Sequence, residues 1–315
     1  MDMPRLRTTL ITALAVLCSP ALFAADMQNS QPASSAVPGT LNYVEGSVSV
    51  DGQPVTEKSI GSVTLHPGQE ISTENGRAEL LLTPGVYFRL GENSAAKMVS
   101  PELTNTVVEL NRGRAAVEVD QIYKENDLHV LEAQVPVQLV KPGLYEFDAD
   151  SNSVKVFKGE AAALRPNDKF VAVKSGHEIN LSDNTELKPA KFNVNAEEQS
   201  GLYRWSSLRS DYLSQANQQI ASTYGEGYAP GWYWDPYRIG YTFIGPSPFY
   251  SPFGWSFYPL GWAGGWGWGY PGWGFGGGYY GGTRWVGPHG PLNLERGGFG
   301  PNPGAHGGHV GGRGR

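Results

Sequence analysis

Residues 39–181 consist largely of short stretches in which apolar and polar residues alternate. Alternation places successive side chains on opposite faces of an extended strand, so one face can be buried while the other meets water. Clear examples are residues 44–50, 115–119, 135–139 and 154–156. The strands are short and evenly spaced, with no helical pattern between them. We therefore expect an all-β domain rather than one built from alternating strands and helices.

Pairs of turn-forming residues separate these stretches. Asn-Gly and Asp-Gly pairs readily adopt the positive φ angles that tight hairpins require. The pairs are Asp51-Gly52, Pro67-Gly68, Asn75-Gly76, Pro84-Gly85, Arg112-Gly113, Pro142-Gly143, Lys158-Gly159 and Ser175-Gly176. They are densest in residues 65–94, which we expect to serve the architecture of the domain rather than binding.

Four parts of this region resemble the FecR domain, the periplasmic sensor module named for a bacterial iron-citrate regulator. They are residues 43–48 (YVEGSV), residues 65–73 (LHPGQEIST), the hairpin formed by 78–82 with 85–90, and the glycine-marked strands 107–119, 143–147 and 154–159. The resemblance covers about 140 of the 315 residues. It implies a β-rich roll, partly solenoid-like, built from short strands.

The regulators of that family also carry a membrane helix and a cytoplasmic helical domain that binds a sigma factor. Here residues 1–25 instead resemble a secretory signal peptide, with Arg5 and Arg7, a short apolar run at 10–17 and small residues at 21–25. A retained anchor is the alternative. We expect an exported protein of the periplasm, outer membrane or cell surface, with no transmembrane segment in the mature chain. Cys18, the only cysteine, lies in the signal, so the mature chain would have no disulfide.

Residues 26–38 are polar and small, which predicts a flexible lead-in. Residues 195–223 predict one amphipathic helix, with Asn195 as its cap and Glu198 completing a capping box. Its apolar stripe comprises Leu202, Trp205, Leu208, Tyr212 and Ile220. We expect this stripe to pack on the β-domain; docking of a partner helix is the alternative.

The composition changes sharply at residue 224. Residues 224–315 contain 29 of the 42 glycines, eight of the nine tryptophans and ten of the sixteen tyrosines. We expect a low-complexity, largely irregular tail with a few extended pieces, because glycine loses much backbone entropy on ordering. Exposed Trp and Tyr are typical of contact surfaces that stack on sugars, meet a membrane interface or self-associate. The candidate contact residues are Trp232, Trp234, Tyr237, Trp255, Trp262, Trp266, Trp268 and Trp273. The alternative is that these rings fold back and shield the edges of the β-domain.

Residues 25–223 contain 17 Lys and Arg against 26 Asp and Glu, a net charge of −9. This acidic body argues against nucleic acid and against anionic lipid as partners. No nucleophile-elbow, phosphate-loop or zinc-protease motif occurs. Glu118 and Asp120 would share a strand face, which we interpret as a solvated face rather than an acid–base pair. We expect no catalytic residue, metal site or cofactor.

These observations favour a non-enzymatic protein of the cell envelope, with a β scaffold that binds envelope proteins or polysaccharides. The alternative is a signalling component that senses an outer-membrane receptor, as the resemblance implies for the family's regulators. An enzyme such as a glycan hydrolase is the third hypothesis and would require two facing carboxylates in a pocket.

Overall fold

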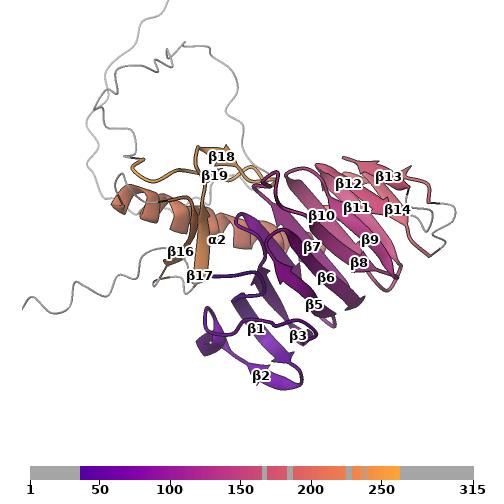
Figure 1. Cartoon of the computed structure of the whole chain (residues 1–315), viewed down its shortest axis with the longest axis horizontal. Coiled ribbons are helices and arrows are strands. Elements are labelled where there is room, and N and C mark those ends of the chain that lie inside the picture. The colour runs from indigo at the N-terminus through magenta and orange to yellow at the C-terminus, as the bar shows by residue number, and fades with distance from the viewer. Residues whose placement is uncertain are drawn as a thin grey trace, which may run out of the picture. The chain divides into compact units, whose positions relative to one another are not determined.

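One large, mainly antiparallel sheet dominates the computed structural model, which describes residues 36–164, 169–182, 187–224, 229–235, 237 and 240–262 (Figure 1). The predicted all-β class with a single long helix is confirmed. The sheet contains β1 (Leu41–Val50), β2 (Gln53–Val55), β3 (Glu70–Leu81), β4 (Val86–Leu90), β5 (Ala95–Glu102), β6 (Asn105–Arg112), β7 (Arg114–Val119), β8 (Leu128–Glu132), β9 (Val135–Leu139), β10 (Gly143–Asp148), β11 (Ser153–Lys158), β12 (Glu160–Leu164), β13 (Phe170–Lys174), β14 (His177–Asn180) and β15 (Ala190–Lys191). A short 3₁₀ helix, η1 (Glu57–Ser59), follows β2.

The long strand β3 joins the two halves of the sheet. Along one edge β3 pairs with β1; along the other, residues 70–72 pair with β5 and residues 78–81 pair with β4. One half continues from β5 through β6, β8, β9 and β12 to β13, and the other from β4 through β7, β10, β11 and β14 to β15. The apolar faces of both halves contribute to one buried cluster, which includes Ile71, Phe88, Val117, Val130 and Phe147. We call this two-sided sheet the β roll.

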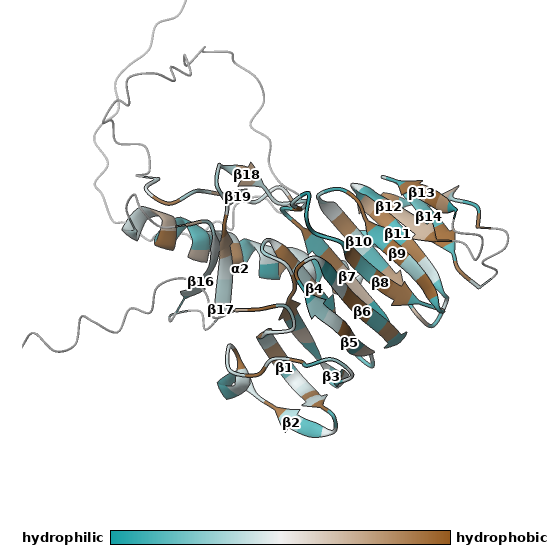
Figure 2. Cartoon of the chain, viewed as in Figure 1, coloured by the Kyte–Doolittle hydropathy of each residue, from teal (hydrophilic) through white to brown (hydrophobic). Residues whose placement is uncertain are grey.

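The alternation predicted from the sequence is visible as apolar and polar bands across the strands (Figure 2). The two central positions of the β1–β2 turn, Asp51 and Gly52, have φ of 47° and 75°, as a tight hairpin requires.

The turn predicted at Asn75-Gly76 is wrong, because β3 continues through both residues. Gly76 lies opposite Gly46 of β1, where the register of the pair shifts. A Cβ added to Gly76 would lie 2.6 Å from the Glu45 carbonyl oxygen, and one added to Gly46 would lie 2.1 Å from that of Asn75. The two glycines therefore permit a close approach of two backbones in mid-strand, which a local turn rule cannot distinguish from a hairpin.

Two helices and two small hairpins follow the β roll. These elements are α1 (Val194–Glu197), α2 (Gly201–Thr223), β16 (Gly231–Asp235), β17 (Gly240–Ile244), β18 (Phe249–Tyr250) and β19 (Ser256–Phe257). β16 pairs with β17 and β18 with β19, so the described part of the glycine-rich tail contains regular pairing. Within the described residues, no helix is long and apolar enough to cross a membrane.

The single helix predicted over residues 195–223 is interrupted. Asn193 caps α1, and the Ser200 hydroxyl caps α2 by accepting a hydrogen bond from the Tyr203 amide at 3.2 Å. Asn195 is therefore inside α1 and is not the cap. Gly201 is the first residue of α2, where the loss of helix propensity costs least.

Candidate functional site

Helix α2 lies against the outer face of the β roll and turns a different stripe toward it than we predicted. Leu202, Trp205 and Ile220 are buried, whereas Leu208 and Tyr212 are 48% and 44% exposed. The buried stripe is completed by Arg209, Leu213 and Ala216. The prediction was wrong at Leu208 and Tyr212 because it assumed that the covered surface of the sheet is apolar.

That covered surface is instead lined with charge. Glu79 of β3 and Arg89 of β4 are direct cross-strand partners, and Glu118 of β7 lies opposite the residue two positions before Arg89. Arg89 donates from Nε to Glu79 at 2.7 Å and from Nη1 to Glu118. From α2, Arg209 donates to Glu79 at 3.0 Å and the Ser210 hydroxyl donates to Glu118 at 2.6 Å. We call Glu79, Arg89, Glu118 and Arg209 the charge cluster.

Every member of the charge cluster is enclosed by protein, with Glu79, Arg89 and Glu118 fully buried. Burial opposes ionisation of Glu79, yet the two arginines outweigh it and lower the pKa of Glu79 to about 2. Arg209 also lies over the Tyr43 ring, 3.9 Å from its centroid, and the Asn42 amide donates to Glu79 at 2.8 Å. The cluster thus connects three strands with α2 through ionised, hydrogen-bonded groups.

The interpretation of Glu118 and Asp120 as a solvated face is wrong, because both residues are buried. Glu118 accepts a hydrogen bond from the Arg89 guanidinium. Burial raises the pKa of Asp120 well above its usual range, and the nearby charge of Glu118 raises it further. Ser210 of α2 donates to Glu118, and burial closes both carboxylates to a substrate.

The hairpins of the tail are held to α2 and β1 by two buried asparagines. Asn217 of α2 donates to the carbonyls of Phe243 and Tyr258 and accepts from the Tyr258 amide at 2.7 Å. Asn42 of β1 donates to the Tyr241 carbonyl at 3.0 Å and accepts from the Tyr241 amide at 2.6 Å. Each asparagine therefore supplies hydrogen bonds to backbone amide and carbonyl groups of the tail, as a neighbouring strand would do in a regular sheet.

Aromatic rings of the tail fill the space between α2 and the roll. Trp232 is buried against Tyr87 and Phe243, with ring centroids 5.1 and 5.7 Å away. The Tyr87 hydroxyl accepts a hydrogen bond from the Phe243 amide at 3.0 Å. Trp232 therefore belongs to the core; it packs on β4, which pairs with β3 and β7 on its two sides, and not on an edge of the sheet.

The other described candidate contact residues keep exposed surface. Tyr237 is 81% exposed, and Trp234, Trp255 and Trp262 are partly exposed. Tyr250, which the sequence analysis did not single out, is 76% exposed. We call these five side chains the aromatic surface. Trp266, Trp268 and Trp273 lie outside the described residues.

Two of these rings are held by α2 and its neighbours. The Trp255 indole donates to the Ser207 carbonyl of α2 at 3.0 Å. Trp262 stacks on Tyr258 with centroids 5.1 Å apart, and Tyr258 is itself fixed by Asn217. The chain from Trp255 to Trp262 thus follows α2, and its exposed rings are oriented before any partner arrives.

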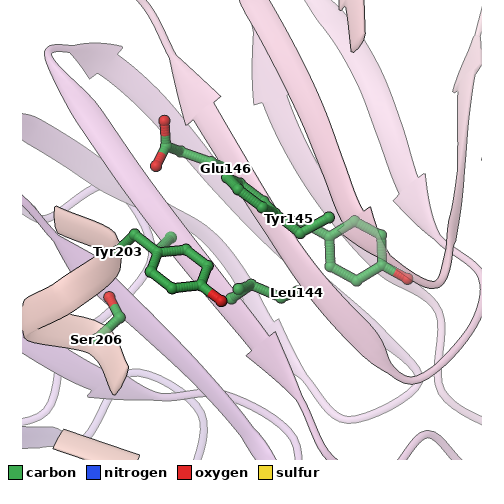
Figure 3. Close-up of a pocket in the computed structure, with 7 residues that line it drawn as sticks. Leu144, Tyr145, Glu146, Tyr203 and Ser206 are labelled. Atoms are coloured by element: carbon green, nitrogen blue, oxygen red, sulfur yellow. The ribbon is translucent and has the colours of Figure 1, made fainter. Parts of the chain in front are cut away.

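Two small hollows accompany these features in the described part of the chain. A hollow between β10 and α2, lined by Leu144, Glu146, Tyr203 and Ser206 among others, is too narrow for a water molecule (Figure 3). The Glu146 carboxylate there is bound by Arg114. A shallow depression of about 200 Å³ lies beside Tyr123 and Gln138. No group of three or more metal-ligating side chains occurs among the described residues.

The charge cluster and the two asparagine clamps were not predicted. A signal for the cluster was present, since Glu79 and Arg89 are the only charged residues in the apolar stretches 78–82 and 86–90. Opposite charges at matching positions of two consecutive strands indicate a cross-strand pair. No pattern in the neighbouring sequence identifies Asn42 or Asn217 as a clamp, because their partners lie far away in the sequence.

Comparisons with known proteins give limited information. No family model and no curated protein matches the chain, so the resemblance to the FecR domain stays a prediction. Two solved structures of a "putative anti-sigma factor" from Parabacteroides distasonis are similar over 42% and 40% of this chain, with TM-scores of 0.35 and 0.34 and identities of 20% and 18%. The matched regions cover 64% and 61% of those chains, slightly less than two thirds. Similarity at this level assigns neither a family nor a function.

Proposed function

We propose that this chain is a non-enzymatic binding protein of the cell envelope, in which the β roll and α2 present the aromatic surface to an envelope polysaccharide. The observation that carries the proposal is the combination of exposed rings with a fixed backbone. Trp255 and Trp262 remain partly exposed although hydrogen bonds to Ser207 and Asn217 tie their segment to α2.

Such an arrangement favours binding because the rings are already ordered. Ordering rotamer-rich side chains at an interface costs about 0.5–1.5 kcal/mol each, and preorganised rings avoid part of that cost. Trp and Tyr combine an apolar face, which can stack on the C–H face of a sugar, with a polar edge that remains hydrated. The acidic body disfavours anionic surfaces, which leaves weakly charged polymers as the better partners.

The envelope location and the non-enzymatic character rest on separate arguments. The signal-peptide pattern of residues 1–25 favours export, and the resemblance to a periplasmic module agrees with it. The charge cluster ties up Glu79 and Glu118 as arginine partners, and α2 covers both. Carboxylates that are paired with arginine and enclosed by protein are poorly suited to glycoside hydrolysis.

Co-sedimentation of the purified mature protein with insoluble envelope polysaccharide tests the proposal. Tyr250→Ala, Trp255→Ala and Trp262→Ala should each weaken binding roughly two- to ten-fold, the equivalent of about 0.5–1.5 kcal/mol per ring. Phe170→Ala is the matched control, because Phe170 is 57% exposed on β13 and outside the aromatic surface.

Binding that is equally weakened by Phe170→Ala, or is unaffected by all three tail substitutions, would refute the aromatic surface as the contact. Capture of an outer-membrane receptor by wild-type protein that fails to sediment with polysaccharide would instead favour the signalling alternative.

A further inference from the structure

One half of the sheet ends on β13, and in the part of the chain that the structure describes no strand pairs with the outer edge of β13. β13 is five residues long, contains no proline and lies away from α2 and the tail hairpins (Figure 1). Two other ends of the sheet are protected, because β2 contains Pro54 and β15 is only two residues long. An open edge like that of β13 can pair with a strand of another chain.

Hydrogen bonds of β12 show which way the backbone groups at this edge point. The Glu160 carbonyl accepts from the Val140 amide beside β9 at 2.9 Å, and the Glu160 amide donates to the Tyr145 hydroxyl at 3.1 Å. Glu160 therefore uses neither group for β13. In an antiparallel ladder, residues that bond to one neighbouring strand alternate with residues that bond to the other. Ala161 and Ala163 are thus the residues of β12 that bond to β13.

The register of β12 and β13 carries this alternation to the open edge. Val173 and Val171 are the partners of these two alanines, so their amide and carbonyl groups are used within the sheet. The backbone groups of Phe170, Ala172 and Lys174 point outward, toward the open edge. The side chains divide in the same way, because Val173 is buried in the core of the roll and Val171 packs against it. The side chains of the three outward residues are exposed.

We propose that β13 pairs antiparallel with β13 of a second copy of this chain, which joins two β rolls through one continuous sheet. A two-fold axis through Ala172 places Phe170 of one copy opposite Lys174 of the other, and Ala172 opposite itself. Every outward amide and carbonyl of these residues then has a partner, and on the inner face Val171 lies opposite Val173. The pairing uses both open edges, so the assembly closes as a dimer.

The charges of this region allow two copies to approach. Residues 160–180 are neutral overall, since three Lys and Arg balance three Asp and Glu, whereas residues 25–223 carry a net charge of −9. In the proposed register Lys174 faces the Phe170 ring instead of a second lysine, which cation–π attraction favours. Shifting one strand by two residues in either direction leaves outward backbone groups of β13 without a partner on the other β13. The proposed register therefore uses the edge most completely.

Sedimentation equilibrium of the mature chain, residues 26–315, tests the proposal, and a dimer is the expected result. Ala172→Pro removes an N–H that the sheet itself does not use, so the fold should tolerate it. It should raise the dissociation constant of the dimer at least about ten-fold, because one donor is lost from each copy. Ala172→Ser keeps the N–H and is the matched control. Because backbone groups make the pairing, Phe170→Ala should weaken the dimer far less than Ala172→Pro.

Introduced cysteines test the register. Cys18 lies outside residues 26–315, so an introduced cysteine is the only thiol in the chain. In Ala172→Cys the two Cα atoms would be about 5.5 Å apart, within the range of about 4.4–6.8 Å that a disulfide spans. Oxidation should therefore cross-link Ala172→Cys to itself. Lys174→Cys should not cross-link alone, but it should cross-link to Phe170→Cys when the two proteins are mixed.

A wild-type chain that stays monomeric at every concentration measured would overturn the proposal. A dimer in which Ala172→Cys does not cross-link would also overturn it, because another surface would then hold the two copies together. Should circular dichroism show that Ala172→Pro does not fold, the cross-linking pattern decides alone, its presence supporting the pairing and its absence refuting it. These measurements contain no polysaccharide, so their outcome is independent of the proposed function.

Discussion

Buried polar side chains decide how this protein is assembled. The two clamp residues, Asn42 and Asn217, and the charge cluster make hydrogen bonds between elements that would otherwise meet only through apolar contacts. Replacing such a cluster with apolar residues is often neutral or stabilising in other proteins, so its presence here is weak evidence for stability. Its hydrogen bonds join Arg209 to Glu79 and Ser210 to Glu118.

A second buried acid lies inside the β roll. Glu132 is the last residue of β8; it is almost fully buried, and neither carboxylate oxygen has a partner among the described residues. Burial, and then the nearby charge of Asp148, raise the pKa of Glu132 to about 8. The native state therefore keeps this proton up to about pH 8, whereas the unfolded chain loses it near pH 4.5.

This difference predicts a pH-dependent stability. The stabilising contribution of Glu132 is fully present below pH 4.5, decreases as the pH rises and is lost above about pH 8. Glu132→Gln should remove that part of the pH dependence and raise the free energy of unfolding at pH 8 by on the order of a few kcal/mol. Urea denaturation at several pH values measures it, with Glu102→Gln at an exposed position as the control. A Glu132→Gln profile parallel to that of the wild type would contradict the assignment.

At the scale of elements, the outer face of the β roll determines which face of α2 is buried. Leu208 and Tyr212 continue an apolar stripe in the sequence, yet the helix exposes them and buries Arg209 instead. Burial of Arg209 is favourable here because its Nη2 donates to Glu79 Oε1 at 3.0 Å and its guanidinium lies over the Tyr43 ring.

Two leucines of α2 distinguish the observed stripe from the predicted one. Leu213→Ala should destabilise the protein by roughly 2–5 kcal/mol, because Leu213 is buried against Leu81 and Tyr87. Leu208→Ala should change stability by less than about 0.5 kcal/mol, because Leu208 is largely exposed. Thermal unfolding of both variants provides the comparison. Equal losses for the two would mean that α2 buries a different face in solution.

The sequence predicted the strands of the β roll well and the surface under α2 poorly, for physical reasons. Alternation is a local property, so the β1–β2 hairpin and the inward positions of β7 could be read from neighbouring residues. The pairing of Gly46 with Gly76 and of Arg209 with Glu79 depends on contacts between distant segments. The sequence showed the aromatic composition of the tail, but it did not predict the pairing of β16 with β17.

At the scale of the molecule, the described part of the tail belongs to the folded body. The hairpin of β16 and β17 reaches both α2 and β1, and Phe257 of β19 is buried in the same aromatic cluster as Trp232. The β roll, α2 and residues 240–262 are therefore coupled through shared buried side chains.

Asn217→Ala tests this coupling. The substitution removes the side-chain amide that donates to the Phe243 and Tyr258 carbonyls and accepts from the Tyr258 amide. Each backbone group that is then buried without a partner should lower the stability by about 1–3 kcal/mol. Amides of residues 240–262 should lose protection from hydrogen exchange while those of β5 and β6 keep it. Gln218→Ala, at an exposed neighbouring position, is the control. Uniform loss across all segments would show that the tail and roll unfold as one unit.

The clamp between Asn42 and Tyr241 has a further consequence for how the chain acquires its structure. The two residues are 199 positions apart, so the chain as far as Tyr241 must be available before the clamp on β1 can form. Contacts of such long range slow folding, because the entropy of closing the loop is lost before the contact forms. β1 must therefore stay without this clamp until Tyr241 has been synthesised, and closing the clamp should be a late step of folding.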